Sequence, residues 1–537
     1  MKREDEIQRR RTVAIISHPD AGKATLTEKF LLYGGAVQEA GSVRARKNQR
    51  SATSDWMEME RQRGISITST VLMFDYQGYR MNLLDTPGHQ DFSEDTYRIL
   101  TAVDSVIMVL DGAKGIEAQT LKLFEVCRKR GIPIFTFINK LDRPTKEPLD
   151  LLDEIEKVLE IGAYPINWPL GTGMDFKGVY DRLEKQVHLF ERTVGGAYKA
   201  PVAVSAIDDE IVAKTLAPDV YPVVREEIEM LDGAGEEFSP ELVLDGTITP
   251  VFFGSAANNF GVELLLNYIF KYAPPPGPFP STKGLVPPES EAFSGFVFKI
   301  QANMDPRHRD RIAFVRVCTG HYEKNIQVHH PSSGRKIKLA SAQAMFGQER
   351  ETIEDAWPGD IIGLISNDKF GIGDTLTQDS GIIYQGIPQF APEHFIFLNN
   401  PNPSNYKRYR DGLDQLLSEG VVQGFNLNTH SQNNYVLGAV GPLQFDVVQY
   451  RMKSEYSAET ERQPTNWSVL RWVHPEVDAS SLDKGTLPVG AINGTDRYGN
   501  LVVLFTNPWS LGLFQDKHPQ FKLSDTPFRK ELLGAER

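Results

Sequence analysis

Short apolar runs alternate with amphipathic stretches over the first part of the chain. Residues 13–16, 81–84, 134–138 and 251–253 have the length and composition of buried strands. A stretch with helical character, residues 23–32, follows the first of these runs. Strands and helices that alternate in this way predict a parallel sheet with helices on both faces.

The pattern changes after residues 274–280, of which five are proline. Such a stretch is stiff and extended, and we interpret it as a domain boundary. Residues 293–300 and 312–317 then have the character of strands, with turn signals at Gly320, Gly334 and Gly359. Short strands at this spacing predict a β-barrel.

A third pattern begins near residue 388. A helix over 409–419, ended by Gly420, precedes a strand over 435–440 and a second helix that opens at Pro442. This order predicts an α+β, ferredoxin-like unit. The expected domains are therefore 1–273, 281–387 and 388–537. The first carries an insertion at about 146–246, in which residues 232–237 predict a turn between helices.

The loop between the first predicted strand and helix carries the clearest chemistry. Gly22 and Lys23 match the end of the pattern G-x-x-x-x-G-K-[ST], in which backbone N–H groups cradle phosphates, the lysine reaches the terminal phosphates and a hydroxyl holds Mg²⁺. Ser17 stands at the first glycine, and Ala24 stands at the hydroxyl. The predicted nucleotide-binding residues of this loop are Ser17, His18, Pro19, Asp20, Ala21, Gly22, Lys23, Ala24 and Thr25.

Three further motifs follow at the carboxyl ends of predicted strands, the edge at which open α/β sheets bind ligands. Asp85 can hold Mg²⁺, and the Gly88 N–H can face a terminal phosphate. The Asp142 carboxylate can accept two hydrogen bonds from guanine, whereas adenine offers no such donor pair. Ser255 and Ala256 suit a backbone contact to the guanine O6. The motifs, which predict GTP and GDP as ligands, are Asp85-Thr86-Pro87-Gly88-His89, Asn139-Lys140-Leu141-Asp142 and Gly254-Ser255-Ala256.

Composition indicates a soluble cytoplasmic protein. The chain has 537 residues, and its 40% apolar and 24% charged content is ordinary for globular proteins. No apolar run is long enough to span a bilayer, and the charged amino terminus lacks the core of a signal peptide. Cys127 and Cys318 are the only cysteines, so a disulfide framework or zinc site is not expected. We expect no membrane partner.

The net charge of −13 argues against a general nucleic-acid binder, and no DNA partner is expected. It leaves room for one local basic face on a large partner. The candidate basic segments are residues 44–47, 306–311 and 406–410.

The motifs resemble those of the translational GTPases, whose marks also include Arg63-Gly64-Ile65-Ser66-Ile67. In that family the residue at Ser66 is usually threonine and closes the first switch over Mg²⁺ and the γ-phosphate. Serine keeps the hydroxyl, so Ser66 and Asp85 are the expected metal ligands. The resemblance implies that His89 positions the attacking water, and Lys23 should neutralise charge on the phosphates. The expected fold is an α/β P-loop GTPase domain, then a β-barrel and a ferredoxin-like domain, as in elongation factor G.

Residues 17–20, 54–60 and 299–305, with the length and domain order, resemble the bacterial peptide-chain release factor three family. The resemblance covers most of the chain and is most specific up to about residue 455. It implies a ribosome-dependent GTPase of translation termination whose partner is the ribosome, both its RNA and its proteins. That family uses GTP to drive off the stop-codon-reading release factors. We expect the chain to act as a monomer.

Ala24 departs from the family pattern, which has threonine at this position. Alanine offers no oxygen to Mg²⁺, and losing even a group that only supports a metal ligand typically costs about 10–100-fold in affinity or activity. Two alternatives therefore stay open. One is a ribosome-binding guanine-nucleotide sensor with impaired hydrolysis. The other is a translocase-like or ribosome-protection factor, although the chain is too short for the two further domains of a full translocase.

Overall fold

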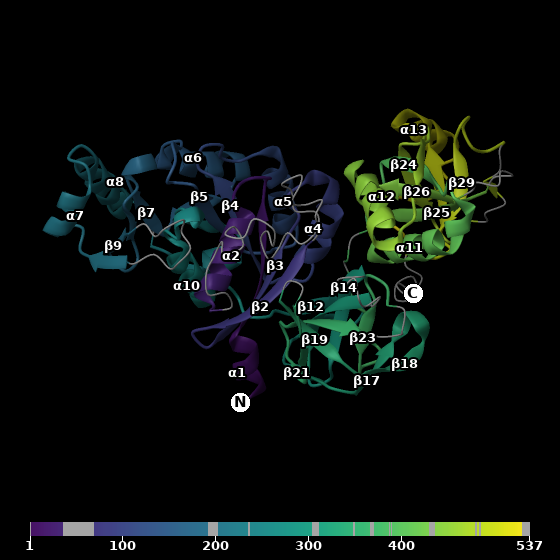
Figure 1. Cartoon of the computed structure of the whole chain (residues 1–537), viewed down its shortest axis with the longest axis horizontal. Coiled ribbons are helices and arrows are strands. Elements are labelled where there is room, and N and C mark those ends of the chain that lie inside the picture. The colour runs from purple at the N-terminus through teal and green to yellow at the C-terminus, as the bar shows by residue number, and fades with distance from the viewer. Residues whose placement is uncertain are drawn as a thin grey trace.

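The computed structural model describes residues 2–35, 69–191, 202–234, 237–302, 311–346, 349–365, 370–385, 387, 389–428, 435–477, 481–482 and 485–528. Figure 1 shows three bodies that follow one another along the chain: a purple-to-teal body that holds most of the helices, a green β body below it and a yellow-green body beside it. No helix within these ranges is long and apolar enough to cross a membrane.

The first body is built on a twisted sheet with strand order β2-β3-β1-β4-β5-β11-β6. All neighbours in it are parallel except β2 and β3. The strands are β1 (Arg10–Ser17), β2 (Thr70–Tyr76), β3 (Tyr79–Asp85), β4 (Ser105–Asp111), β5 (Ile134–Asn139), β6 (Gly162–Pro165) and β11 (Ile248–Phe253). The predicted strands 13–16, 81–84, 134–138 and 251–253 lie within four of them, which confirms the parallel sheet.

Helices cover both faces of this sheet, so alternate residues of β1 enter two different cores. Val13 and Ile15 pack with α2 and α10, whereas Ala14 and Ile16 pack with α4, α5 and α6. These helices are α2 (Lys23–Tyr33), α4 (Ser93–Leu100), α5 (Ala118–Lys129), α6 (Pro148–Leu159) and α10 (Val262–Tyr272); a short helix, α1 (Arg3–Gln8), precedes β1. Burial on both faces explains why the strands have continuous apolar runs rather than alternation.

Within residues 146–246, β6 belongs to the main sheet and α6 packs against it. The rest forms an added lobe. The lobe is the antiparallel sheet β10-β9-β8-β7 with three helices. Its elements are β7 (Asn167–Leu170), β8 (Gly178–Asp181), β9 (Gln186–Phe190), β10 (Val202–Ser205), α7 (Glu210–Thr215), α8 (Val220–Ala234) and α9 (Pro240–Leu244). The turn predicted from residue 232 is wrong at its start, because Asp232 and Gly233 continue α8. The Asp232 carboxylate is held by Arg182 at 3.1 Å and Lys185 at 2.5 Å, which anchors that helix end.

The second body is antiparallel and confirms the predicted β-barrel. Its main strand order is β18-β17-β23-β14-β15-β22-β19, around a core that includes Val297, Val315 and Leu376. Its strands are β12 (Phe279–Ser281), β13 (Gly284–Val286), β14 (Ser294–Ala302), β15 (Arg311–Thr319), β16 (Tyr322–Glu323), β17 (Ile326–His330), β18 (Arg335–Leu339), β19 (Ala342–Phe346), β20 (Glu349–Ile353), β21 (Asp355–Ala356), β22 (Ile361–Ile365) and β23 (Thr375–Thr377).

The third body begins with the order β-α-β-β-α-β and the sheet order β27-β24-β26-β25, which is ferredoxin-like as predicted. These elements are β24 (His394–Asn399), α11 (Tyr406–Glu419), β25 (Gln423–Leu427), β26 (Tyr435–Ala439), α12 (Leu443–Tyr456) and β27 (Glu461–Pro464). α11 ends at Gly420, whose φ of +72° is left-handed. The sheet continues from β25 through β29 (Ile492–Asp496), β30 (Leu501–Phe505), β28 (Val469–Val473) and β31 (Leu523–Ser524), with α13 (Pro508–Lys517) beside it.

Buried polar contacts join the first body to the barrel near the start of β1. The Arg10 guanidinium lies 2.9 Å from the Asp360 carboxylate, and the Thr12 hydroxyl donates to the Gly359 carbonyl at 2.7 Å. A second pair, Arg316 with Asp104, lies 2.7 Å apart. Removing one partner of a buried ion pair is strongly destabilising. These contacts therefore fix the strand that leads into the phosphate loop against the second body.

Candidate nucleotide-binding site

The predicted phosphate loop joins β1 to α2 at the carboxyl edge of the sheet. Gly22 precedes the helix with a φ of +100°, and Asp20 is also left-handed with a φ of +67°. The first N–H groups of a helix have no partner within it, and together with the helix dipole they favour an anion. The backbone of this loop is therefore suited to phosphate.

The side chains of Ser17 and His18 contact the backbone of the loop and help to fix its conformation. The Ser17 hydroxyl donates to the His18 carbonyl at 2.9 Å. His18 is buried, its Nδ1 lies 2.6 Å from the Pro19 carbonyl oxygen, and it pairs with Glu117. Burial lowers the pKa of His18 despite the opposing charge of Glu117. Glu117 was not predicted, because it lies in a different part of the chain and in no recognised motif.

Lys23 and Asp85 lie side by side under the loop. The lysine Nζ is 2.5 Å from Asp85 Oδ1, and both side chains are buried. The Thr86 hydroxyl donates to the Ile15 carbonyl at 2.7 Å, which ties the segment after β3 to β1. A methyl group placed on Gly88 would lie 3.6 Å from Pro19 Cα. Lys23 and Asp85 are thus adjacent, and the segment after Asp85 lies against β1 and the phosphate loop.

The Asn139 side chain connects the phosphate loop to the predicted base-recognition motifs. Its Nδ2 donates to the Ala21 carbonyl at 2.8 Å. Its Oδ1 accepts from the backbone N–H of Ala256 at 2.9 Å and of Lys140 at 2.8 Å. Asn139 is buried, and its bonds to Ala21 and Ala256 are shielded from water. One amide therefore holds three of the four motifs in register.

Further bonds shape the base end of the site. The Ser255 hydroxyl donates to Asp142 Oδ1 at 2.6 Å. The Leu141 N–H donates to the Gly254 carbonyl at 3.1 Å. Lys140 is left-handed, with a φ of +71°, and its Nζ lies 2.7 Å from Asp111. Burial opposes the charge on Asp111, but the hydrogen bonds from Lys140 and from a backbone N–H lower its pKa. Asp111 was not predicted, although it ends a buried strand at the same edge.

His89 lies directly after Gly88, at the start of the 3₁₀ turn η1 (Gln90–Phe92). Its Nδ1 accepts from the Asp91 N–H at 3.2 Å, and its side chain is 28% exposed, so the ring is accessible from solvent. Its ring also packs at an angle to Phe92, with centroids 6.2 Å apart.

Of the two predicted Mg²⁺ ligands, Ser66 and Asp85, only Asp85 is among the described residues; Ser66 lies outside them. Ala24 is half-buried in the first turn of α2 and has no side-chain oxygen. Mg²⁺ usually binds one or two carboxylates together with substrate phosphates and several waters. Asp85, buried beside Lys23, fits the role of that carboxylate.

Comparison with protein families gives three consecutive matches. The model described as the Elongation factor Tu GTP binding domain matches residues 8–275. The model for Elongation factor G domain 2 matches residues 292–379. The model for the Class II release factor RF3, C-terminal domain, matches residues 384–515.

Similar proteins match over nearly the whole chain. The peptide chain release factor 3 of Gloeobacter violaceus is 56% identical over 520 residues, covering 97% of this chain and 98% of the relative. That of Cyanothece sp. is 53% identical over 521 residues, covering 97% and 96%. A crystal structure from Thermus thermophilus has a TM-score of 0.68 at 21% identity, covering 90% of this chain and 72% of that one, which shows the shared fold.

Proposed function

Since the chain belongs to the peptide chain release factor 3 family, we propose that it uses GTP hydrolysis to drive the stop-codon-reading release factors off the ribosome. It is a GTP-binding translational GTPase that acts with the ribosome in termination. The comparisons favour neither the nucleotide sensor nor the translocase-like factor. We further propose that it works as a monomer in the cytoplasm, with domains 1–273, 281–387 and 388–537.

The observation that carries the proposal is the buried Asn139 amide. It bonds to the phosphate loop through Ala21 and to the base end through Ala256. The phosphate and base ends of the site are consequently held at a fixed separation. This supports a role for the predicted residues from Ser17 to Thr25, Asp85 to His89, Asn139 to Asp142 and Ser255 to Ala256 in holding one guanine nucleotide.

In the proposed reaction a water oxygen attacks the γ-phosphorus and the bond to the bridging oxygen breaks, giving GDP and phosphate. This chemistry depends on positioning and on charge neutralisation. We infer that Lys23 exchanges its contact with Asp85 for the terminal phosphates when GTP binds. His89 orients the water. A bound Mg²⁺, held by Asp85 and Ser66, supplies further positive charge at the phosphates.

The hydrolysis step acts as the reset of a mechanical switch. The γ-phosphate orders the segments that follow the phosphate loop and β3, and its loss releases them. We propose that only the GTP-bound conformation displaces the release factors. In this scheme Ala24 weakens the binding of Mg²⁺, because alanine has no side-chain oxygen. This chain should therefore hydrolyse GTP more slowly than a matched chain with threonine at position 24.

The proposed function is tested with ribosomes stalled after peptide release and carrying a labelled stop-codon-reading factor. We expect dissociation of the label with GTP and full-length protein, and little dissociation with GDP. GTP hydrolysis measured with and without ribosomes should rise on ribosomes. Dissociation that is equally fast with GDP would contradict the proposal.

A substitution at the base end tests guanine recognition. We expect Asp142→Asn to weaken GDP binding and tighten xanthosine diphosphate binding, each by about tenfold, the value of one hydrogen bond. The reason is that an amide can donate to the 2-oxo group of xanthine, whereas the carboxylate accepts from the 2-amino group of guanine. Competition binding measures the ratio. Asp142→Ala is the control and should lose guanine affinity without gaining xanthine affinity; an unchanged ratio in Asp142→Asn would remove Asp142 from base recognition.

A further inference from the structure

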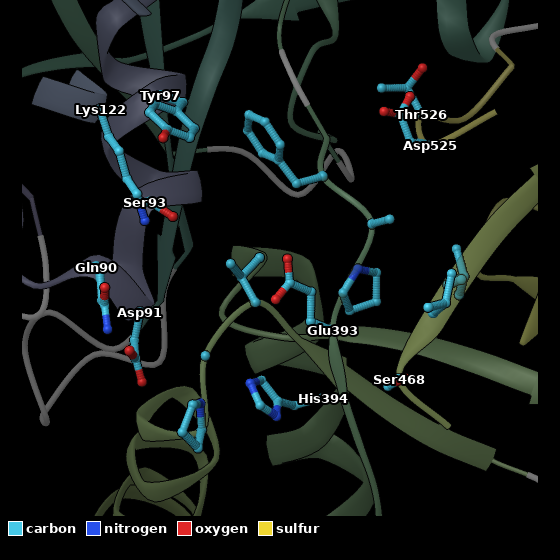
Figure 2. A pocket seen from close by; sticks show the side chains of 18 of the residues that line it. Gln90, Asp91, Ser93, Tyr97, Lys122, Glu393, His394, Ser468, Asp525 and Thr526 are labelled. Carbon is cyan, nitrogen blue, oxygen red and sulfur yellow. The ribbon is translucent and has the colours of Figure 1, made fainter. Parts of the chain in front are cut away.

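A cleft separates the segment that carries His89 from the third body. Its volume is about 990 Å³. Figure 2 shows Gln90, Asp91 and Ser93 on one side of it and Glu393 and His394 on the other. Asp91, which lines the cleft, also reaches across to α12.

Asp91 forms a direct link between the two bodies. One oxygen of its buried carboxylate accepts from the backbone N–H of Leu443, the first residue of α12, at 2.8 Å. These residues are 352 positions apart in the chain. A carboxylate is stabilised at this end of a helix by the unpaired N–H groups and by the helix dipole.

The third body is shaped to receive this carboxylate. Gly441 lies so close to Asp91 that a methyl group on it would collide with the Asp91 carboxyl group. Its φ is not left-handed, so an alanine here would be opposed by the Asp91 side chain and not by the backbone conformation. The contact therefore depends on a side chain from one body and on the lack of a side chain in the other.

Neighbouring contacts hold η1 and α4 to the third body as one unit. Phe92 packs against Val447 in a small apolar cluster. The rings of Tyr97 and Phe390 lie 4.9 Å apart between centroids. A movement of the third body away from η1 and α4 would have to break these contacts as well as that of Asp91 with Leu443.

The same aspartate also contacts His89. His89 Nδ1 accepts from the Asp91 N–H, and this nitrogen lies 3.3 Å from the Asp91 carboxylate oxygen that is not bonded to Leu443. Within the described residues, the polar and ring contacts of His89 are with Asp91 and Phe92. Both of those residues touch the third body. The ring thus contacts two residues of η1 that also contact α12.

We propose that Asp91 is a positioning residue that couples the third body to His89. While its carboxylate is bonded to the start of α12, η1 stays in contact with the third body. His89 is then held in a resting orientation. Separation of the third body from η1 frees the imidazole to orient water. This inference rests on the proposed role of His89. It attributes slow GTP hydrolysis in the absence of the ribosome to one contact between the first and third bodies.

The first test is the substitution Asp91→Ala in the full-length protein. We expect ribosome-free GTP hydrolysis in single turnover to rise about tenfold, the size set by one hydrogen bond to a charged group. The ribosome-stimulated rate should change less, so the ratio of the two rates falls. Gln90→Ala is the control because Gln90 is the exposed neighbour in η1, and it should leave both rates unchanged. An Asp91→Ala protein with an unchanged or lower ribosome-free rate would overturn the proposal.

The second test breaks the same contact from the third body. Gly441→Ala displaces the Asp91 carboxylate while every residue of η1 stays unchanged, and it should raise the ribosome-free rate as Asp91→Ala does. Combining the two substitutions should add little, because each removes the same contact. Fully additive effects would show two independent causes and would overturn the proposal.

A double variant separates this inference from the proposed catalytic role. In Asp91→Ala/His89→Ala the gain in ribosome-free hydrolysis should disappear. If the gain persists in the double variant, the restraint exists but does not act through His89, and the coupling proposed here is wrong. If His89→Ala alone leaves ribosome-stimulated hydrolysis unchanged, the catalytic role itself is wrong.

Discussion

Ribosome-stimulated GTP hydrolysis is expected to fall about 100-fold or more in His89→Ala, which is within the range that positioned acid–base groups contribute. His89 follows Gly88, which lies against the phosphate loop at Pro19. Within the described residues the ring is partly exposed, and its contacts are with Asp91 and Phe92 in the adjoining turn η1. GDP affinity should therefore stay within a few-fold of the parent.

The measurement is single-turnover hydrolysis on saturating ribosomes, with GDP affinity determined on the same preparations. His89→Gln is an informative companion, because an amide can still hold a water by hydrogen bonds and should keep more activity than alanine. Equal hydrolysis by His89→Ala and the parent would remove His89 from the reaction. A large loss of GDP affinity would instead show that the substitution disturbs the site as a whole.

The sequence predicted the order of elements well because local rules decide it. Buried parallel strands carry continuous apolar runs, and the four nucleotide motifs follow directly from such runs. Gly420 ends α11 as predicted, since the left-handed residue that closes a helix is most often glycine. The turn predicted from residue 232 was wrong at its start because contacts distant in the chain outweighed the local preference. An Asp-Gly pair favours a turn locally, but the ion pairs of Asp232 with Arg182 and Lys185 hold it in α8.

Contacts between distant segments were beyond sequence reasoning. Nothing near Asp91 in the chain indicates that it meets Leu443, because that contact is created by the placement of one body on another. The same holds for His18 with Glu117 and for the hydrogen bonds of the Asn139 amide to Ala21 and Ala256. The motifs identify what the site binds. The side chains that hold the motifs together become visible only in the fold.

The second large effect is expected at the phosphate loop, where Ala24→Thr should speed ribosome-stimulated hydrolysis and tighten GTP binding in Mg²⁺, by about 10–100-fold where the metal is limiting. The position lies in the first turn of α2, one residue after Lys23. Thr25, the next residue, is turned about 100° around the helix and cannot take over the contact. GDP affinity should change less, because GDP lacks the γ-phosphate whose charge a bound Mg²⁺ would help to neutralise.

Ala24→Val is the matched control, since valine has the shape of threonine without its hydroxyl. If the metal is the cause, Val gives no gain, and a chelator removes the difference between Ala24→Thr and the parent. A gain shared by Val and Thr would trace the effect to packing in the first turn of α2. If Thr matches the parent in GTP affinity and turnover at limiting Mg²⁺, the metal is held adequately without this hydroxyl. In that case Asp85 and the phosphates suffice to bind the metal, and Ala24 does not slow the reaction.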